Sequence, residues 1–260
     1  MIYELVWLNP WLFAIALNTI LISMGLIVAK KLLTIPGWIH AWILGVLIWG
    51  CLGWRGYIIV VFYFFVGSGV TRIGMAEKEA AGIAEKRGGA RGPENVWGSA
   101  LTGALCGLGV FFLQLLFPDL VEIQSWISLL LLGYVASFST KLSDTCGSEI
   151  GKAYGKQTFL ITTLKPVPKG TEGAVSLEGT LAGVLASIIV SILAWSLGLI
   201  DIWGIIWSVI AAFIATNLES VIGATLQTKL TWLTNEIVNF INTLLGAIAA
   251  ILFAYLWQLL

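Results

Sequence analysis

Long apolar stretches recur along the whole chain, separated by short polar connections. A helix that crosses the hydrocarbon core of a bilayer needs about 20 apolar residues, with a range of roughly 17–25. On that criterion the pattern predicts eight spans, near residues 9–29, 38–53, 56–74, 98–117, 126–145, 176–199, 203–224 and 236–259. The second is short and the third contains three glycine or serine positions (67–69), so six or seven spans are also possible. The sequence therefore predicts an all-α, polytopic integral membrane helical bundle, one domain over residues 1–260.

Composition narrows the class of protein further. The 260 residues are 58% hydrophobic and 11% charged, whereas a soluble domain carries about 25% charged residues. Lysine plus arginine equals aspartate plus glutamate, with 14 of each, and no basic helix stands out, so no nucleic-acid partner is expected. The single histidine, His40, excludes a multi-histidine metal centre. The three cysteines lie far apart in the sequence, which indicates packed free thiols.

The basic residues are distributed very unevenly over the predicted connections. If the N-terminus is outside, thirteen of the fourteen lysines and arginines fall on the inner side, and only Arg55 lies outside. Cytoplasmic connections are enriched in lysine and arginine. The pattern therefore predicts both termini outside, with the two long polar loops, about 75–97 and 151–175, in the cytoplasm. Candidate chemistry is expected at the cytoplasmic ends of the helices, facing membrane lipids.

The segment from Lys141 to Lys156 holds carboxylates, hydroxyls, glycines and lysines directly after an apolar run. A charged side chain inside a bilayer costs about 2.5–3.5 kcal/mol on the mildest scale, so such residues usually line a site. Asp144 can ligate Mg²⁺, and Lys152 and Lys156 can bind phosphates. The other candidates here share helical faces with these residues or bring backbone close to a ligand: Ser148, Glu149 and Gly151. The alternative is a helix end whose lysines reach up to the headgroups.

Further candidates lie in the connections and in the last two spans. Arg91 and Asn95 stand just before a span, where a guanidinium can clamp a phosphate. The turn with Thr171, Gly173 and Ser176 is either a phosphate cradle or a helix cap. In the C-terminal part the polar candidates within apolar surroundings are Glu219, Asn235, Glu236 and Asn239. Asn242 continues the same stripe, and we expect it to bond between helices.

The segment Asp144-x-x-x-Ser148-x-x-Gly151-Lys152-x-Tyr154-Gly155-Lys156 resembles the signature of CTP-using membrane lipid enzymes, the polyprenol and dolichol kinases and phosphatidate cytidylyltransferases. Other segments narrow the resemblance to the phytyl-phosphate kinase family, which includes an uncharacterised animal transmembrane branch. These segments are Thr71-Arg72 with 77–85 and 91–96, then 170–180, 218–227 and 234–240. The resemblance covers roughly residues 10–255. Glutamate stands at 219 and 236, where that family is expected to have aspartate more often.

This resemblance implies transfer of a phosphoryl group from a nucleoside triphosphate, CTP or another, to an isoprenoid monophosphate. The specific expectation is phytyl phosphate converted to phytyl diphosphate, feeding tocopherol and phylloquinone synthesis in a plasma, inner or thylakoid-type membrane. Asp144 and Glu219 would hold Mg²⁺, with Glu149 or Glu236 as further carboxylates. Lys152, Lys156 and Arg91 would bind phosphates, and Asn235 and Asn239 would orient the donor or the lipid. The alternatives are a CTP-dependent prenol kinase or lipid cytidylyltransferase, or a cation-coupled transporter or flippase.

Overall fold

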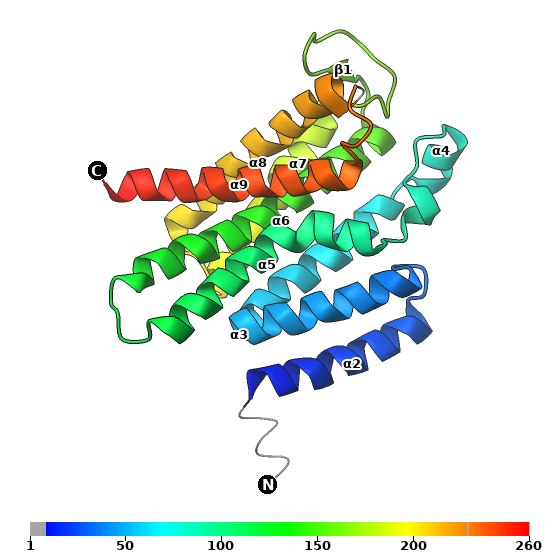
Figure 1. The fold of residues 1–260 in the computed structure, drawn as a ribbon. Helices are drawn as coiled ribbons and strands as arrows, with labels where there is room; N and C mark the ends of the chain where they lie inside the picture. The colour runs from blue at the N-terminus through cyan, green and yellow to red at the C-terminus, as the bar shows by residue number, and fades with distance from the viewer. Residues whose placement is uncertain (1–8, 228, 260) are drawn as a thin grey trace.

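The computed structural model describes residues 9–227 and 229–259, and it is almost entirely helical (Figure 1). Its elements are α2 (Pro10–Val28), α3 (Ile35–Arg72), α4 (Met75–Ala80), η1 (Lys86–Gly89), α5 (Pro93–Leu116), α6 (Ile123–Tyr154), β1 (Phe159–Leu160), β2 (Ala174–Val175), α7 (Leu177–Ser196), α8 (Ile202–Ile222), η2 (Gly223–Gln227) and α9 (Asn235–Gln258). Seven of the described helices are long and apolar enough to cross a membrane. The all-α membrane bundle is confirmed. The placement of the N-terminus itself falls outside the described residues.

Side-chain caps fix where several of these helices begin. Thr34, Asp201 and Thr234 each accept a hydrogen bond from a backbone N–H in the first turn that follows. Such a cap satisfies a donor that has no partner inside the helix. The predicted starts agree with the observed ones to within three residues, except at α5. That helix begins at Pro93 instead of 98, and Asn95 Oδ1 there accepts a bond from Gly92 N at 2.9 Å.

Helix α3 is a hairpin of two helical limbs. A straight helix of 38 residues would be about 57 Å long, yet Arg72 at its end donates to the Lys31 carbonyl, which precedes its start, at 2.9 Å. The reversal occurs at Gly53, whose φ of 63° is readily adopted only by glycine. The limbs lie side by side (Figure 1) and match the predicted spans 38–53 and 56–74. Counting α3 twice, the described chain makes eight passes.

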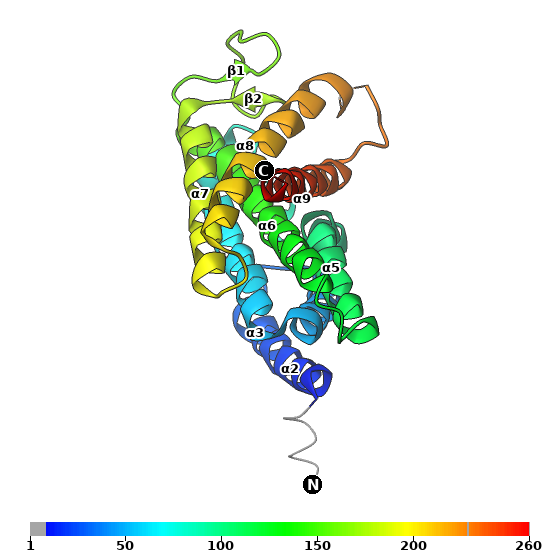
Figure 2. The same cartoon turned by 90° about the vertical axis from the view of Figure 1, so that its left-hand side faces the viewer.

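Helix α6 is the central element and packs on α3, α5, α7, α8 and α9 (Figure 2). Its 32 residues give a length of about 48 Å, whereas the hydrocarbon core is about 30 Å thick. The predicted span 126–145 was therefore wrong at its C-terminal end by nine residues. The predicted loop 151–175 begins only after Tyr154. Candidate residues from Asp144 to Lys152 consequently share one rigid helix.

Two folded connections meet at the end of the bundle to which α6 extends (Figure 1). The predicted 75–97 loop contains α4 and η1, and its last five residues belong to α5. The 155–176 connection contains a small antiparallel pair, β1 with β2, which was not predicted. A Cβ built on Gly170 would lie only 2.5 Å from Ile83 Cγ2, so the two connections touch. Both therefore cover the same end of α6.

The α3 hairpin makes a prediction about sidedness. Single cysteines replacing Arg55 and Lys86 should react with a membrane-impermeant maleimide from opposite faces of intact vesicles, because these exposed positions lie at opposite ends of the bundle. Asp119→Cys should react from the same face as Arg55→Cys. The native cysteines 51, 106 and 146 are free and buried, so unmodified protein should give little background. Labelling of positions 55 and 86 from one face would contradict the hairpin.

Candidate functional site

A buried lysine in the second half of α6 joins two helices through polar contacts. Lys141 Nζ lies 2.5 Å from Asp144 Oδ2, one turn further along α6, and donates to Asn239 Oδ1 on α9 at 2.7 Å. The Lys141 side chain is 8% exposed and that of Asp144 is 19% exposed. Burial of an ion pair requires that nearly every donor and acceptor has a partner. Lys141 therefore fixes the position of α9 against the carboxylate of α6.

A second carboxylate lies beside the first. The carboxyl group of Glu219 on α8 lies within hydrogen-bonding reach of Asp144 and within electrostatic reach of Lys141. Asn242 Nδ2 donates to Glu219 Oε2 from the fully buried face of α9. Residues Lys141, Asp144, Glu219, Asn239 and Asn242 are called the carboxylate cluster below. Three separate helices thus bring the predicted residues Asp144, Glu219 and Asn239 together.

The carboxylate cluster fits a divalent cation that is completed by its substrate. Two carboxylates in contact need a neighbouring positive charge to stay ionised. Asn242 Oδ1 is buried beside Glu219 and has no hydrogen-bond partner. Within the described residues, no group of three or more histidine, cysteine, aspartate or glutamate side chains could hold a metal ion. Mg²⁺ usually takes one or two carboxylates and fills its shell with phosphates and water, so the pair is sufficient.

Glu149 belongs to a separate group of charges further along α6. It forms a completely buried ion pair with Lys78 of α4, and its Oε1 accepts from Lys152 at 3.1 Å. Lys152 also lies 3.6 Å from Glu85. Residues Lys78, Glu85, Glu149 and Lys152 are called the ion-pair cluster. Lys152 stands between the two clusters, since it lies within electrostatic reach of Asp144.

Arg91, just before α5, and Asn95, in the first turn of α5, approach the same end of the bundle from the other side. Arg91 donates to the Tyr63 hydroxyl at 2.8 Å, and no carboxylate of the described chain pairs with it. Asn95 accepts from Arg87 and lies 3.4 Å from Glu236 Oε1. Arg91 is partly buried and keeps donors for an anion. Glu236 is held beside α5. Among the described residues it makes no hydrogen bond or ion pair with the carboxylate cluster.

The remaining predicted residues have local partners or none. Asn235 bonds to Gln227, Ser148 donates to the Thr145 carbonyl, and Thr171 donates to the Pro168 carbonyl. Ser176 accepts from Gly179 N and caps α7, as the alternative interpretation predicted. Gly173 has a φ of 77°, and a Cβ there would lie 2.5 Å from the Ser220 carbonyl. Lys156 is exposed and has no hydrogen bond or ion pair within the described chain.

Residues 18–247 match the family described as "Integral membrane protein DUF92". The chain belongs to the DUF92 family.

It is 65% identical to an uncharacterized membrane protein of Synechocystis sp., over 93% of this chain and 90% of that protein. It is 45% identical to Protein VTE6, chloroplastic, of Arabidopsis thaliana, over 93% and 71% of the two chains. An uncharacterized membrane protein of Methanocaldococcus jannaschii is 32% identical, over 83% of each chain. No solved structure matches the chain. The resemblance to the phytyl-phosphate kinase family is confirmed.

Glycines of the α6 signature pack against α7 in this DUF92 protein. A Cβ on Gly179 of α7 would lie 2.4 Å from the Gly147 carbonyl, and one on Gly151 would lie 3.2 Å from Ser176 Oγ. Small residues spaced by four let the backbones of membrane helices approach closely. Gly151 was expected to bring backbone close to a ligand, and the structure places it in this helix seam. The seam holds the charged end of α6 in place.

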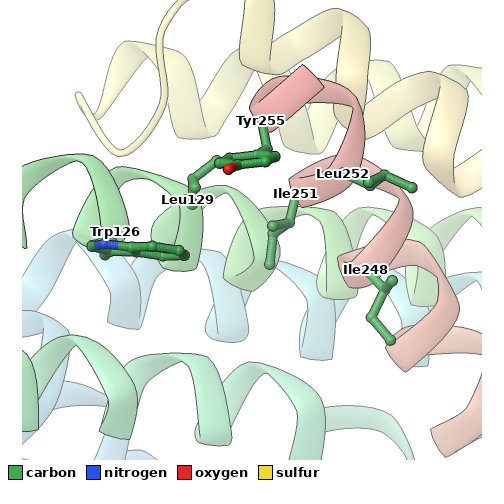
Figure 3. Close-up of a pocket in the computed structure, with 6 residues that line it drawn as sticks. All are labelled: Trp126, Leu129, Ile248, Ile251, Leu252 and Tyr255. Carbon is green, nitrogen blue, oxygen red and sulfur yellow. The ribbon is translucent and has the colours of Figure 1, made fainter. Parts of the chain in front are cut away.

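An apolar groove lies at the opposite end of α6 and α9 (Figure 3). It is lined by Trp126, Leu129, Ile248, Ile251, Leu252 and Tyr255. Leu129 precedes Asp144 by 15 residues, which is about 22 Å along the helix. The six residues that line the groove include no charged group.

Three residues of the DUF92 site were not among the predicted site residues. Lys141 was noted only as the start of the signature, although its position among apolar residues was a usable signal. Asn242 was expected to bond between helices, which it does, but its partner is the candidate ligand Glu219. Lys78 lies in the polar loop 75–97 that was predicted to be cytoplasmic, and nothing in its local sequence indicates that it is buried.

The α6–α7 seam yields a test with a matched control. Gly179→Ala should lower the Tm of the detergent-solubilised protein by about 3–10 °C, because the added methyl group meets backbone. Gly69→Ala, at an exposed helical position with nothing within 4 Å, should leave the Tm unchanged or slightly higher. Intrinsic tryptophan fluorescence during heating measures both. Equal Tm values for the two variants would show that the seam is loose.

Proposed function

We propose that this protein is an isoprenoid-phosphate kinase that converts phytyl phosphate to phytyl diphosphate. The single observation that supports this most is the carboxylate cluster, in which the buried Lys141 lies beside the half-buried Asp144 and Glu219. Membership of the same family as VTE6, at 45% identity, supports the substrate class and a role in tocopherol and phylloquinone synthesis.

Asp144 and Glu219 would hold Mg²⁺, which on binding neutralises charge on the donor phosphates. Their geometry suits this role because both carboxyl groups project from rigid helices to one point. Asn242 fixes Glu219, and Asn239 fixes Lys141. Phosphoryl transfer depends mainly on positioning and charge stabilisation. No histidine or strong general base is required, since the attacking phosphate oxygen of the lipid is already anionic.

The basic residues around the cluster would bind the phosphates. Lys152 lies within electrostatic reach of Asp144, and Arg91 has no carboxylate partner within the described chain. In the reaction, an oxygen of phytyl phosphate forms a bond to the γ-phosphorus of the nucleoside triphosphate, CTP or another. The β–γ anhydride bond breaks and the nucleoside diphosphate leaves. The cations stabilise charge on the transferred group.

The position of the site also suits an amphiphilic substrate. The cluster lies at the charged end of the bundle, which carries the basic connections and is therefore assigned to the cytoplasmic face by the positive-inside rule. A phosphate headgroup at this depth leaves its isoprenoid tail in the bilayer. A soluble nucleotide would approach the same face of the membrane from water.

The proposal is tested by incubating membranes that contain the protein with phytyl phosphate, Mg²⁺ and each nucleoside triphosphate. Wild type should form phytyl diphosphate and a nucleoside diphosphate, as read by mass spectrometry. Asp144→Asn and Glu219→Gln should each lower kcat by roughly 100-fold or more. Asp119→Asn, an exposed carboxylate at the opposite end, should retain full activity. Pyrophosphate release with a nucleotide-linked lipid would instead identify a cytidylyltransferase, and no product from folded protein with any donor would contradict the proposal.

Asn242 gives a second expectation. Asn242→Leu removes the donor that holds Glu219 and should lower kcat/KM by about 10–100-fold, as expected for a residue that orients a metal ligand. The loss should shrink when Mg²⁺ is raised, because a weakened site is refilled by mass action. Steady-state kinetics over a Mg²⁺ series measures this. An activity that is independent of Asn242 would contradict its assigned role.

A further inference from the structure

Lys78 and Glu149 are the most deeply buried oppositely charged pair in the described chain, with side chains 1% and 2% exposed. Removing two charges from water is costly, and apolar residues of similar volume often serve stability as well or better. The pair lies outside the carboxylate cluster. Its contacts point to a purpose beyond joining α4 to α6.

The two oxygens of Glu149 are divided between two ammonium groups. Oε2 faces Lys78, and Oε1 accepts from Lys152 at 3.1 Å. Lys78 makes a second bond, to the Thr71 carbonyl at 2.8 Å, which anchors it to the end of α3. Because Lys78 holds Oε2, the plane of the Glu149 carboxylate is fixed. Lys152 therefore has a defined partner and a defined direction.

Lys152 is the member of this group that a ligand can reach. Its side chain is 21% exposed, and it lies within electrostatic reach of Asp144. Without the positive charge of Lys78, Glu149 would present a full negative charge close to any bound phosphate. With it, the Lys78–Glu149 pair is neutral, and the negative charge that remains beside Lys152 is that of Glu85, 3.6 Å away and 48% exposed. A solvent-exposed partner of this kind holds a lysine weakly, so an anion can compete for Lys152.

We propose that Lys78 is a positioning residue, which acts through Glu149 to hold Lys152 in place for binding a diphosphate group. This deepens the proposed function and rests on it for the identity of the natural ligand. Glu149 is thereby assigned to the orientation of a cation, whereas the sequence suggested a direct catalytic carboxylate.

The test replaces both Lys78 and Glu149 with neutral residues, so that no unpaired charge is left buried. Lys78→Met/Glu149→Gln should fold with a Tm close to wild type, because both partners become neutral together. Its Kd for inorganic pyrophosphate, measured by calorimetry with purified protein and Mg²⁺, should rise about 10-fold or more. Where nucleotide turnover is measured, KM should rise with kcat changed less than about threefold. A purely structural pair would leave Kd and KM unchanged, and that result would overturn the proposal.

A cycle with Lys152→Ala separates action through Lys152 from other effects. Lys152→Ala alone should weaken pyrophosphate binding, and adding Lys78→Met/Glu149→Gln should weaken it no further. Multiplicative effects would overturn the proposal, as would a wild type that binds no pyrophosphate. If the neutral pair does not fold, Glu149→Gln alone is put through the same cycle. A wild type that binds pyrophosphate but makes no lipid diphosphate would contradict the kinase function and leave this inference intact.

Discussion

The buried charge of Lys141 is the constraint on which the polar end of this bundle depends. An ammonium group that is only 8% exposed inside a bundle of membrane helices needs charged or polar partners from its neighbours. Asp144 supplies the charge from the same helix, Glu219 adds charge from α8, and Asn239 accepts a bond from α9. Because these partners come from three helices, the packing of α8 and α9 on α6 is set by electrostatics at this end. The geometry of a cation site follows from the same contacts.

Close helix packing makes this convergence possible. In lipid there is little hydrophobic drive between helices, so association relies on van der Waals contact between surfaces of small residues. α6 presents glycines and serines to α7, and Thr140 to Gly246 of α9, over most of its length. The small residues bring the backbones together, and the charged residues then fall within bonding distance. Gly147 and Gly151 of the signature thus have a packing role. Asp144 and Lys152 remain its candidate ligand-binding residues.

Much of the fold could be predicted from the sequence because membrane spans follow from length and hydrophobicity alone. Eight passes and the meeting of Asp144, Glu219 and Asn239 at one end were predicted correctly. The C-terminal end of α6 was missed because polar residues on a helix that leaves the bilayer resemble a loop. The burial of Lys78 could not be predicted, since it depends on how α4 folds back over α6. The local sequence shows which residues are charged. It does not show which residue each buried charge will contact, because that depends on the tertiary fold.

The distribution of charged residues through the depth of the bundle helps to decide whether the protein is an enzyme or a transporter. A transport pathway needs charged or polar groups from one face to the other, whereas the buried charges of the described chain, Lys78, Lys141 and Glu149, all lie in the part of the bundle nearer α4 and the β1–β2 connection. At the other end, Arg55, Asp119, Glu122 and Asp201 lie in exposed turns, and the groove beside α9 is apolar. The buried polar residues that continue along α6 beyond the carboxylate cluster are uncharged, among them Ser137, Ser139 and Thr140. This one-ended distribution of buried charge favours an enzyme that acts at one membrane surface over a cation-coupled transporter.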